Sequence, residues 1–244
     1  MNLAIESNEQ RDIDVLHQIG ERIAAADPLH TVLKTVVDLV SAVLKCDSCF
    51  VYVLEDGELT LRASKNPHAE VIDRLKLRLG QGITGWVAEH RKPVSIASQA
   101  AHDPRFRSFD ELPEDRFEAF LSVPILCRDK LVGVINAQHR DAYPYSQREV
   151  RLISTIGFLV GPEVELVRME AESSKFSELA EARELVEKAQ SVVARNVHAS
   201  PEDAHAILKA ESQRRRKSMK EIAEAIVIAD EIFRAKDRAA GSAP

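Results

Sequence analysis

The chain has 244 residues and a formal net charge of −6, with 45% hydrophobic and 30% charged residues. This composition is that of a globular protein with room for one large domain or two unequal ones. It contains no run of about 18 apolar residues and no basic and apolar leader, so we expect a cytoplasmic protein with no membrane partner.

Helical and strand periodicities alternate through the first part of the chain. Apolar residues at helical spacing predict an N-terminal helix within residues 1–28, which Asp27-Pro28 interrupts before the same period resumes over 29–44. The β-branched and aromatic run at 48–54, the turn signal at Asp56-Gly57 and the alternation at 59–63 predict a β-hairpin.

A second strand pair precedes a long helix. Segments 120–127 and 131–139 flank a polar turn and predict another hairpin, with Pro124 at an edge or a bulge because proline has no N–H to donate. From about Ser146 apolar residues recur every three or four positions, and the stripe continues past Gly161-Pro162, which predicts a kink rather than a helix end. Residues 29–162 therefore predict an α+β domain, an antiparallel sheet flanked by helices.

No strand signal follows Glu163, so the rest of the chain is predicted to be all-α. We expect a connecting helix or coiled coil at 163–178, a module of three helices at 179–236 and a disordered tail at 237–244. Ser200 and Ser218 have the position of helix N-caps, because Asp203 and Glu221 follow them at the spacing of a capping box.

The three cysteines favour packing over chemistry. Cys46 and Cys49 form a C-x-x-C pair, but no second Cys or His pair lies at ligand spacing, and a structural zinc site needs about four ligands. With Cys127 the number is odd, which excludes a disulfide scaffold. We therefore expect no metal site and no catalytic residue.

One segment carries a family resemblance. Glycines at 80, 82 and 85 allow a tight turn into a helix that a tryptophan can anchor. This segment resembles the helix-opening motif of GAF domains, and the resemblance covers about residues 29–165. The matching segments are GQGITGWVA at 80–88, RKPVSI at 91–96, DPRF at 103–106, SVPI at 122–125 and GVIN at 133–136. The resemblance to GAF domains implies a regulatory domain that binds a small-molecule ligand or receives a protein signal. It leaves the cofactor unknown.

The C-terminal segment resembles the ANTAR family of RNA-binding antiterminators over about residues 175–235. The resemblance implies an antitermination regulator that binds paired hairpins in a leader transcript. The matching residues are Lys188-Ala189, Ser200 to Ala204, Leu208-Lys209, Ser212, Arg214, Lys217 and Ile222-Ala223. Glu211 departs from the pattern, because the family prefers a small apolar residue there, and we expect it to weaken phosphate attraction locally.

A candidate RNA surface follows from charge. Residues 175–244 hold 13 Lys and Arg against 12 Asp and Glu, so a nucleic-acid surface must be a local patch. Proteins that bind RNA loops need cations that contact the phosphate backbone and planar groups that stack on the bases, and arginine supplies both. Basic residues at a helix end also occur for stability alone, which is the competing interpretation. The predicted RNA-binding residues are Lys188, Arg195, Lys209, Ser212, Arg214, Arg215, Arg216, Lys217 and Lys220.

A candidate sensor pocket follows from the aromatic residues near segment 97–119, which could line an apolar cavity or belong to the core. They are Trp86, Phe106, Phe109, Phe117 and Phe120.

Two hairpin loops require two modules, so we expect a homodimer through the connecting helices, whose apolar stripe at 153–171 leads into 179–193. Two other functions stay open. The helical tail could bind a protein instead of RNA, or the cysteines could serve a thiol-dependent methionine sulfoxide reductase, an activity found in some GAF-like domains.

Overall fold

The computed structural model describes residues 2–65, 71–107 and 117–240. Its internal contacts divide the chain into two units, residues 1–168 and 169–244, and each is described by itself. None of the described helices combines the length and the apolar character needed to cross a membrane.

The first unit is built on an antiparallel sheet of six strands in the order β3-β2-β1-β6-β5-β4. The long central strands carry β-branched and aromatic residues, whereas the two edge strands are short. The strands are β1 (Ser48–Glu55), β2 (Glu58–Ser64), β3 (Lys76–Arg78), β4 (Val94–Ile96), β5 (Ala119–Cys127) and β6 (Lys130–His139).

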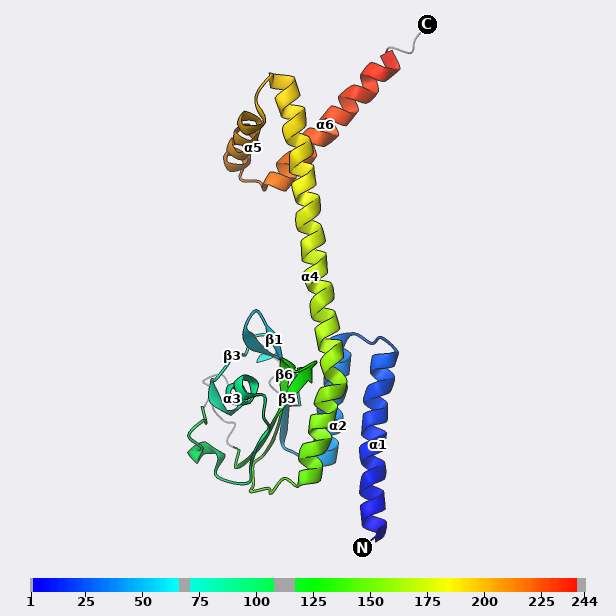
Figure 1. Cartoon of the computed structure of the whole chain (residues 1–244), viewed down its shortest axis with the longest axis vertical. Coiled ribbons are helices and arrows are strands. Elements are labelled where there is room, and N and C mark those ends of the chain that lie inside the picture. Colours follow the sequence, from blue (N-terminus) through cyan, green and yellow to red (C-terminus); the bar gives the residue numbers. More distant parts are fainter. Residues whose placement is uncertain (1, 66–70, 108–116, 241–244) are drawn as a thin grey trace. The chain divides into compact units, whose positions relative to one another are not determined.

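Helices cover both faces of this sheet (Figure 1). One face packs against α2 (Leu29–Leu44) and the first part of α4 (Gln147–Val197), and α1 (Asn2–Ala24) packs against α2. All three helices contribute to the larger core cluster. The other face packs against α3 (Gly82–His90), and a 3-10 turn at Ala100–His102 follows β4. This α+β architecture is the one that the alternation of periodicities predicts.

Both predicted hairpins are present. Asp56 and Gly57 join β1 to β2 with positive φ angles, and Arg128 and Asp129 do the same between β5 and β6, as tight two-residue turns require. The pairing of β4 with β5 ends at Ser122, so Pro124 faces no partner strand on that side, and a register shift follows at Ile125 and Leu126.

A buried polar bridge fixes α3 on the sheet. The Ser122 hydroxyl donates to the Asn136 side-chain oxygen at 2.7 Å, and the Asn136 amide donates to the Thr84 hydroxyl at 2.8 Å. All three side chains are almost fully buried. Because buried polar groups are costly unless paired, this bridge specifies where the first turn of α3 lies.

Helix α4 continues through Pro162, as expected from the apolar stripe. Two glycines one turn apart allow its backbone to approach β5. A Cβ at Gly157 would lie 2.9 Å from the Pro124 carbonyl oxygen, and a Cβ at Gly161 would lie 2.2 Å from that of Leu126. Both helix and strand would have to separate to admit any larger residue.

The second unit contains the last part of α4, α5 (Pro201–Arg215) and α6 (Met219–Ala240), around a small core of Ala189, Leu208, Ile222 and Ala223. The predicted caps are formed: the Asp203 N–H donates to the Ser200 hydroxyl, and the Ser218 N–H donates to the Glu221 carboxylate.

Residues 237–240, which we expect to belong to a disordered tail over 237–244, are helical. Helix α6 runs to Ala240 because no Gly or Pro interrupts it before Gly241. Residues 241–244 lie outside the described residues.

The cysteines of the C-x-x-C pair are core residues. Cys46 and Cys49 are 1% and 0% exposed, and both belong to the larger core cluster. Burial raises the pKa of the Cys46 thiol and raises the pKa of Cys49 well above its usual range. Cys127 is half-buried. The reactive thiolate is therefore disfavoured at Cys46 and Cys49.

We predict that a thiol-specific disulfide reagent at pH 8 modifies at most one cysteine of the folded protein, Cys127, and all three after denaturation. Titration with and without denaturant measures this, and a Cys127→Ser variant should show no fast reaction. Rapid modification of Cys46 or Cys49 in the folded protein would contradict their burial.

We predict that Gly161→Ala destabilises the protein by about 1–3 kcal/mol, because the added methyl overpacks the contact with the β5 backbone. Gly20→Ala in α1 is the matched control. No atom lies within 4 Å of its added Cβ, so the higher helix propensity of alanine should stabilise by about 0.5–1 kcal/mol. Urea unfolding of both variants checks the difference, and equal effects would argue against the close approach.

Candidate functional sites

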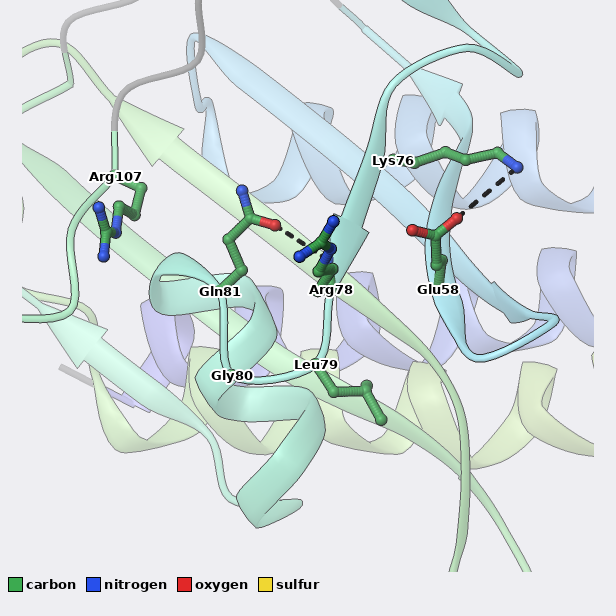
Figure 2. Close-up of a pocket in the computed structure, with 7 residues that line it drawn as sticks. All are labelled: Glu58, Lys76, Arg78, Leu79, Gly80, Gln81 and Arg107. Carbon is green, nitrogen blue, oxygen red and sulfur yellow. Dashed lines mark hydrogen bonds and ion pairs between the residues drawn. The ribbon is translucent and has the colours of Figure 1, made fainter.

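A hollow of about 650 Å³ lies beside the loop that connects β3 to α3 (Figure 2). We call it the β3–α3 hollow. Residues from β2, β3, this loop and the segment after the 3-10 turn line it. They are Glu58, Lys76, Arg78, Leu79, Gly80, Gln81 and Arg107.

The loop has its shape because of its glycines. Gly80 has a φ of +77°, and its N–H donates to the Gly85 carbonyl at 2.8 Å, which folds the loop against α3. A Cβ at Gly85 would lie 2.5 Å from the Arg78 carbonyl oxygen, so only glycine allows this approach. The glycine motif therefore builds a compact loop at the mouth of the hollow.

The hollow is positively charged. Lys76 and Glu58 form a loose pair, with Nζ and Oε2 3.9 Å apart and both side chains largely exposed. Neither Arg78 nor Arg107 forms an ion pair with any residue that the structure describes. Figure 2 shows Arg78 between Arg107 on one side and Lys76 on the other. The described lining residues thus include three cations and one carboxylate, and the Glu89 carboxylate lies beside Gly80, with its Oε2 3.2 Å from where a Cβ of residue 80 would be.

The aromatic residues of the predicted sensor pocket lie elsewhere. Among the described residues that line the β3–α3 hollow, none is aromatic. Trp86 and Phe106 pack partly buried on the core cluster that contains Phe120, and Phe117 is 9% exposed. Phe109 lies outside the described residues.

The ring of Trp86 also contacts the side chains of His90 and Arg105. The His90 ring stacks on it at 4.0 Å between centroids, and the Arg105 guanidinium lies 4.8 Å from its ring. Asp103 holds that guanidinium at 2.7 Å, and this hydrogen bond lowers the pKa of the Asp103 carboxyl. The assignment of the aromatic residues to a sensor pocket stays a prediction.

Sequence reasoning missed the cations of the hollow, although a signal was present. The segment from Arg74 to Leu79 alternates basic and leucine residues, which is the pattern of a strand with one basic face. A lysine- and arginine-rich edge strand such as β3 also prevents unwanted strand pairing. Arg107 is distant in sequence from these residues, so only the fold brings it to them.

In the second unit, the predicted RNA-binding cations form two groups. The first, which we call the cationic corner, lies where α5 meets α6. All of its side chains are exposed. It comprises Arg214, Arg215, Arg216, Lys217 and Lys220.

One carboxylate reduces the charge of the cationic corner. Glu211 accepts hydrogen bonds from Arg214, at 2.8 Å, and from Arg215. These bonds lower the pKa of Glu211, and the bond to Glu211 raises the pKa of Arg214. Arg216, Lys217 and Lys220 form no ion pair with a described residue, although the charge of Lys217 contributes to the lowered pKa of Glu221. Glu211 thus compensates part of the charge of the cationic corner, and its effect on phosphate attraction stays a prediction.

Ser212 has a structural contact. Its hydroxyl donates to the Lys217 carbonyl, and its own carbonyl accepts the Lys217 N–H at 3.1 Å. These bonds close the turn between α5 and α6 and thereby fix the backbone of the cationic corner.

The second group faces acidic residues. Lys188 pairs with Glu184 at 2.7 Å, and Arg195 pairs with Asp230 of α6 at 2.6 Å. Lys209 is exposed on α5. The structure therefore gives the cationic corner, and not the α4 cations, the larger uncompensated charge.

Comparisons with known proteins agree with this division. The GAF domain family matches residues 28–164, and the ANTAR domain family matches residues 175–227. The chain is 29% identical over 146 residues to the phosphoenolpyruvate-dependent phosphotransferase system protein of Escherichia coli K12, covering 58% of this chain and 19% of that protein. It is 26% identical over 164 residues to the Nif-specific regulatory protein of Herbaspirillum seropedicae, covering 64% and 30%. The chain thus spans less than a third of the length of these relatives.

Solved structures show the same sensor fold. The GAF domain of a phosphoenolpyruvate-protein phosphotransferase from Coxiella burnetii has a TM-score of 0.62 at 26% identity, covering 67% of this chain and 98% of that one. A free methionine-R-sulfoxide reductase from Neisseria meningitidis has a TM-score of 0.55 at 16% identity, covering 65% and 91%, which concerns the fold alone. The chain therefore belongs to the GAF domain family, and an ANTAR domain follows its GAF domain.

Proposed function

We propose that this chain is a transcription antitermination regulator whose ANTAR domain binds RNA hairpin loops under the control of a signal at its GAF domain. The two domains and the resemblance to Nif-specific regulatory proteins support a signal-sensing regulator with an ANTAR output domain. RNA recognition and the small-molecule or protein signal are the further steps of the proposal.

The cationic corner is the observation that carries the RNA step. Five cations gather within seven residues of a chain whose net charge is −6, and Glu211 is the carboxylate that the structure places on them. Backbone phosphates attract such a patch, and arginine can also stack on unpaired bases. Because the patch is small, it fits a compact hairpin loop better than an extended duplex.

Helix α4 is the element through which a signal would act. It contributes Ile153, Ile156 and Val160 to the core of the first unit and Ala189 to that of the second. A ligand that favours one arrangement of this helix would change the population of RNA-competent chains. Coupling of this kind is a difference in affinity between two states.

A dimer would present two RNA-binding modules to paired hairpins. Within the second unit, Met169, Phe176 and Leu179 of α4 are 57%, 72% and 67% exposed, at spacings of seven and three residues. Large exposed apolar residues at heptad spacing are typical of a coiled-coil seam. We therefore propose that α4 pairs with α4 of a second copy.

We expect the full chain to bind a leader RNA with two paired hairpins more tightly than duplex DNA of equal length, as measured by gel shift at several salt concentrations. Arg216→Gln with Lys217→Gln should weaken RNA binding about tenfold or more and reduce the salt dependence, since phosphate contacts are lost. Glu211→Gln should strengthen binding, because it releases Arg214 and Arg215.

Lys175→Gln with Arg183→Gln is the matched control, since it removes two exposed cations of α4 outside the cationic corner. Its RNA affinity should stay within about twofold of the original. Equal binding of RNA and DNA would refute the RNA-specific function. An RNA affinity unchanged by the variant of Arg216 and Lys217 would favour a protein-binding role for the helical tail.

We predict that Phe176→Lys with Leu179→Lys converts a dimer into a monomer, because two charges would replace apolar residues in the seam. Sedimentation equilibrium measures the mass. Glu178→Lys, which changes an exposed residue between them, is the control and should leave the dimer intact. A native chain that is already monomeric at micromolar concentration would contradict the proposed seam.

A further inference from the structure

We propose that the β3–α3 hollow binds a small organic oxyanion, a phosphate ester or a dicarboxylate, and that this anion is the signal of the GAF domain. The inference rests on the proposed function for its role as a signal, but not for the binding itself.

The first argument compares the charge of the hollow with the net charge of the first part of the chain. Residues 1–174 hold 20 Lys and Arg against 27 Asp and Glu, so the first part of the chain repels anions on average. The β3–α3 hollow reverses this locally, because three of its described lining residues are cations and one, Glu58, is a carboxylate. A concave surface with one sign of charge concentrates ligands of the opposite sign.

The second argument is that the arginines are free to bind. Arg62, in the neighbouring strand β2, is held by Glu55 and Asp73, as is common for a structural arginine. Arg78 and Arg107 have no such carboxylate within the described ranges, and both are exposed. Two guanidinium groups near one hollow offer paired hydrogen bonds that match the oxygens of a phosphate or carboxylate.

The third argument is the start of α3. Its N-cap residue Gln81 lines the hollow, yet no side chain caps the helix, because the Gln81 oxygen accepts the Arg78 N–H at 3.1 Å instead. The partial positive charge of a helix N-terminus therefore adds to that of the arginines. Gly82 leaves room at this point, since the nearest atom to an added Cβ is the Arg107 Cβ at 3.6 Å.

The size of the hollow indicates that the anion has an organic part. Leu79, which is 43% exposed, adds an apolar residue to the lining, and its side chain points away from those of Arg78 and Lys76 (Figure 2). The volume of about 650 Å³ also exceeds that of a bare inorganic ion and falls in the range of small-molecule sites. Because carboxylates and phosphates share the recognition chemistry, the probes must separate them.

Isothermal titration calorimetry of the full chain with glycerol 3-phosphate, inorganic phosphate and succinate, at constant ionic strength, tests the inference. We expect saturable binding of one anion per chain for glycerol 3-phosphate or for succinate, and the preferred probe identifies the class. Arg78→Gln with Arg107→Gln should weaken that binding at least tenfold, because each guanidinium supplies charge-assisted hydrogen bonds.

Arg74→Gln with Arg140→Gln is the matched control, since it removes two exposed arginines of the same unit that do not line the hollow. Its affinity should stay within about twofold. Absence of saturable binding for all three probes, or equal weakening in both double variants, would overturn the inference.

A gel shift with the paired-hairpin RNA, in the presence and absence of the preferred probe, separates the two proposals. The anion should change the RNA affinity of the original chain and leave that of the Arg78 and Arg107 variant unchanged. RNA binding without any anion binding would refute only the anion site, whereas anion binding without RNA binding would refute only the proposed function.

Discussion

The backbone contact between α4 and β5 is the constraint on which the first unit depends. Gly157 and Gly161 bring the helix against the carbonyl groups of Pro124 and Leu126, and the apolar side chains on either side of them then enter the core. Larger residues at these two positions would lift the helix and expose Ile153, Ile156 and Val160. The same helix later supplies Ala189 to the second core. In the proposed function, a signal would therefore act by changing how α4 packs against the sheet.

Electrostatics explains how an acidic chain can present two surfaces rich in positive charge. At physiological ionic strength, exposed charges act over about 8 Å, so the net charge of the chain matters less than the charges within one patch. Among the described residues that line the β3–α3 hollow, Glu58 is the one carboxylate, and in the cationic corner, Glu211 pairs with Arg214 and Arg215. Elsewhere several described arginines form ion pairs with carboxylates, as Arg105 does with Asp103 and Arg183 with Glu187.

The elements with strong local signals could be predicted from the sequence, and those defined by the tertiary fold could not. Asp56-Gly57 specifies a tight turn by its own backbone preferences, and Ser218 with Glu221 specifies a helix start. Strand β4 has three residues and no alternating pattern long enough to predict it, and β3, within the alternating segment 74–79, has only three residues that pair with β2. Helix α6 passes the expected end because the sequence from 237 to 240 still favours helix.

Some candidate-site residues could likewise be predicted from the sequence, whereas others are brought together only by the tertiary fold. A run such as Arg214 to Lys217 is visible in the sequence because its members are neighbours, but their pairing with Glu211 depends on the helical spacing of three and four residues. The β3–α3 hollow joins residues from four segments, and Arg107 enters it only through the fold. Aromatic residues near segment 97–119 have the same sequence pattern whether they line a pocket or fill a core, and Phe120 packs in the core.

The conformation of Arg216 bears on the competing interpretation of the cationic corner as helix stabilisation alone. Arg216 ends α5 with a φ of +55°, a left-handed conformation that glycine adopts at lower cost. Lys45 and Arg91 end α2 and α3 in the same way, so a single cation at such a position is explained by the negative end of the helix dipole. Arg214 and Arg215 already lie in the last turn of α5, where the dipole acts, and both also pair with Glu211. Lys217 lies in the turn before α6, where its charge lowers the pKa of Glu221, and Lys220 lies in the first turn of α6, where a helix disfavours positive charge. Helix stability alone gives no reason for Lys220 at this end of α6, whereas the proposed contact with RNA would give one.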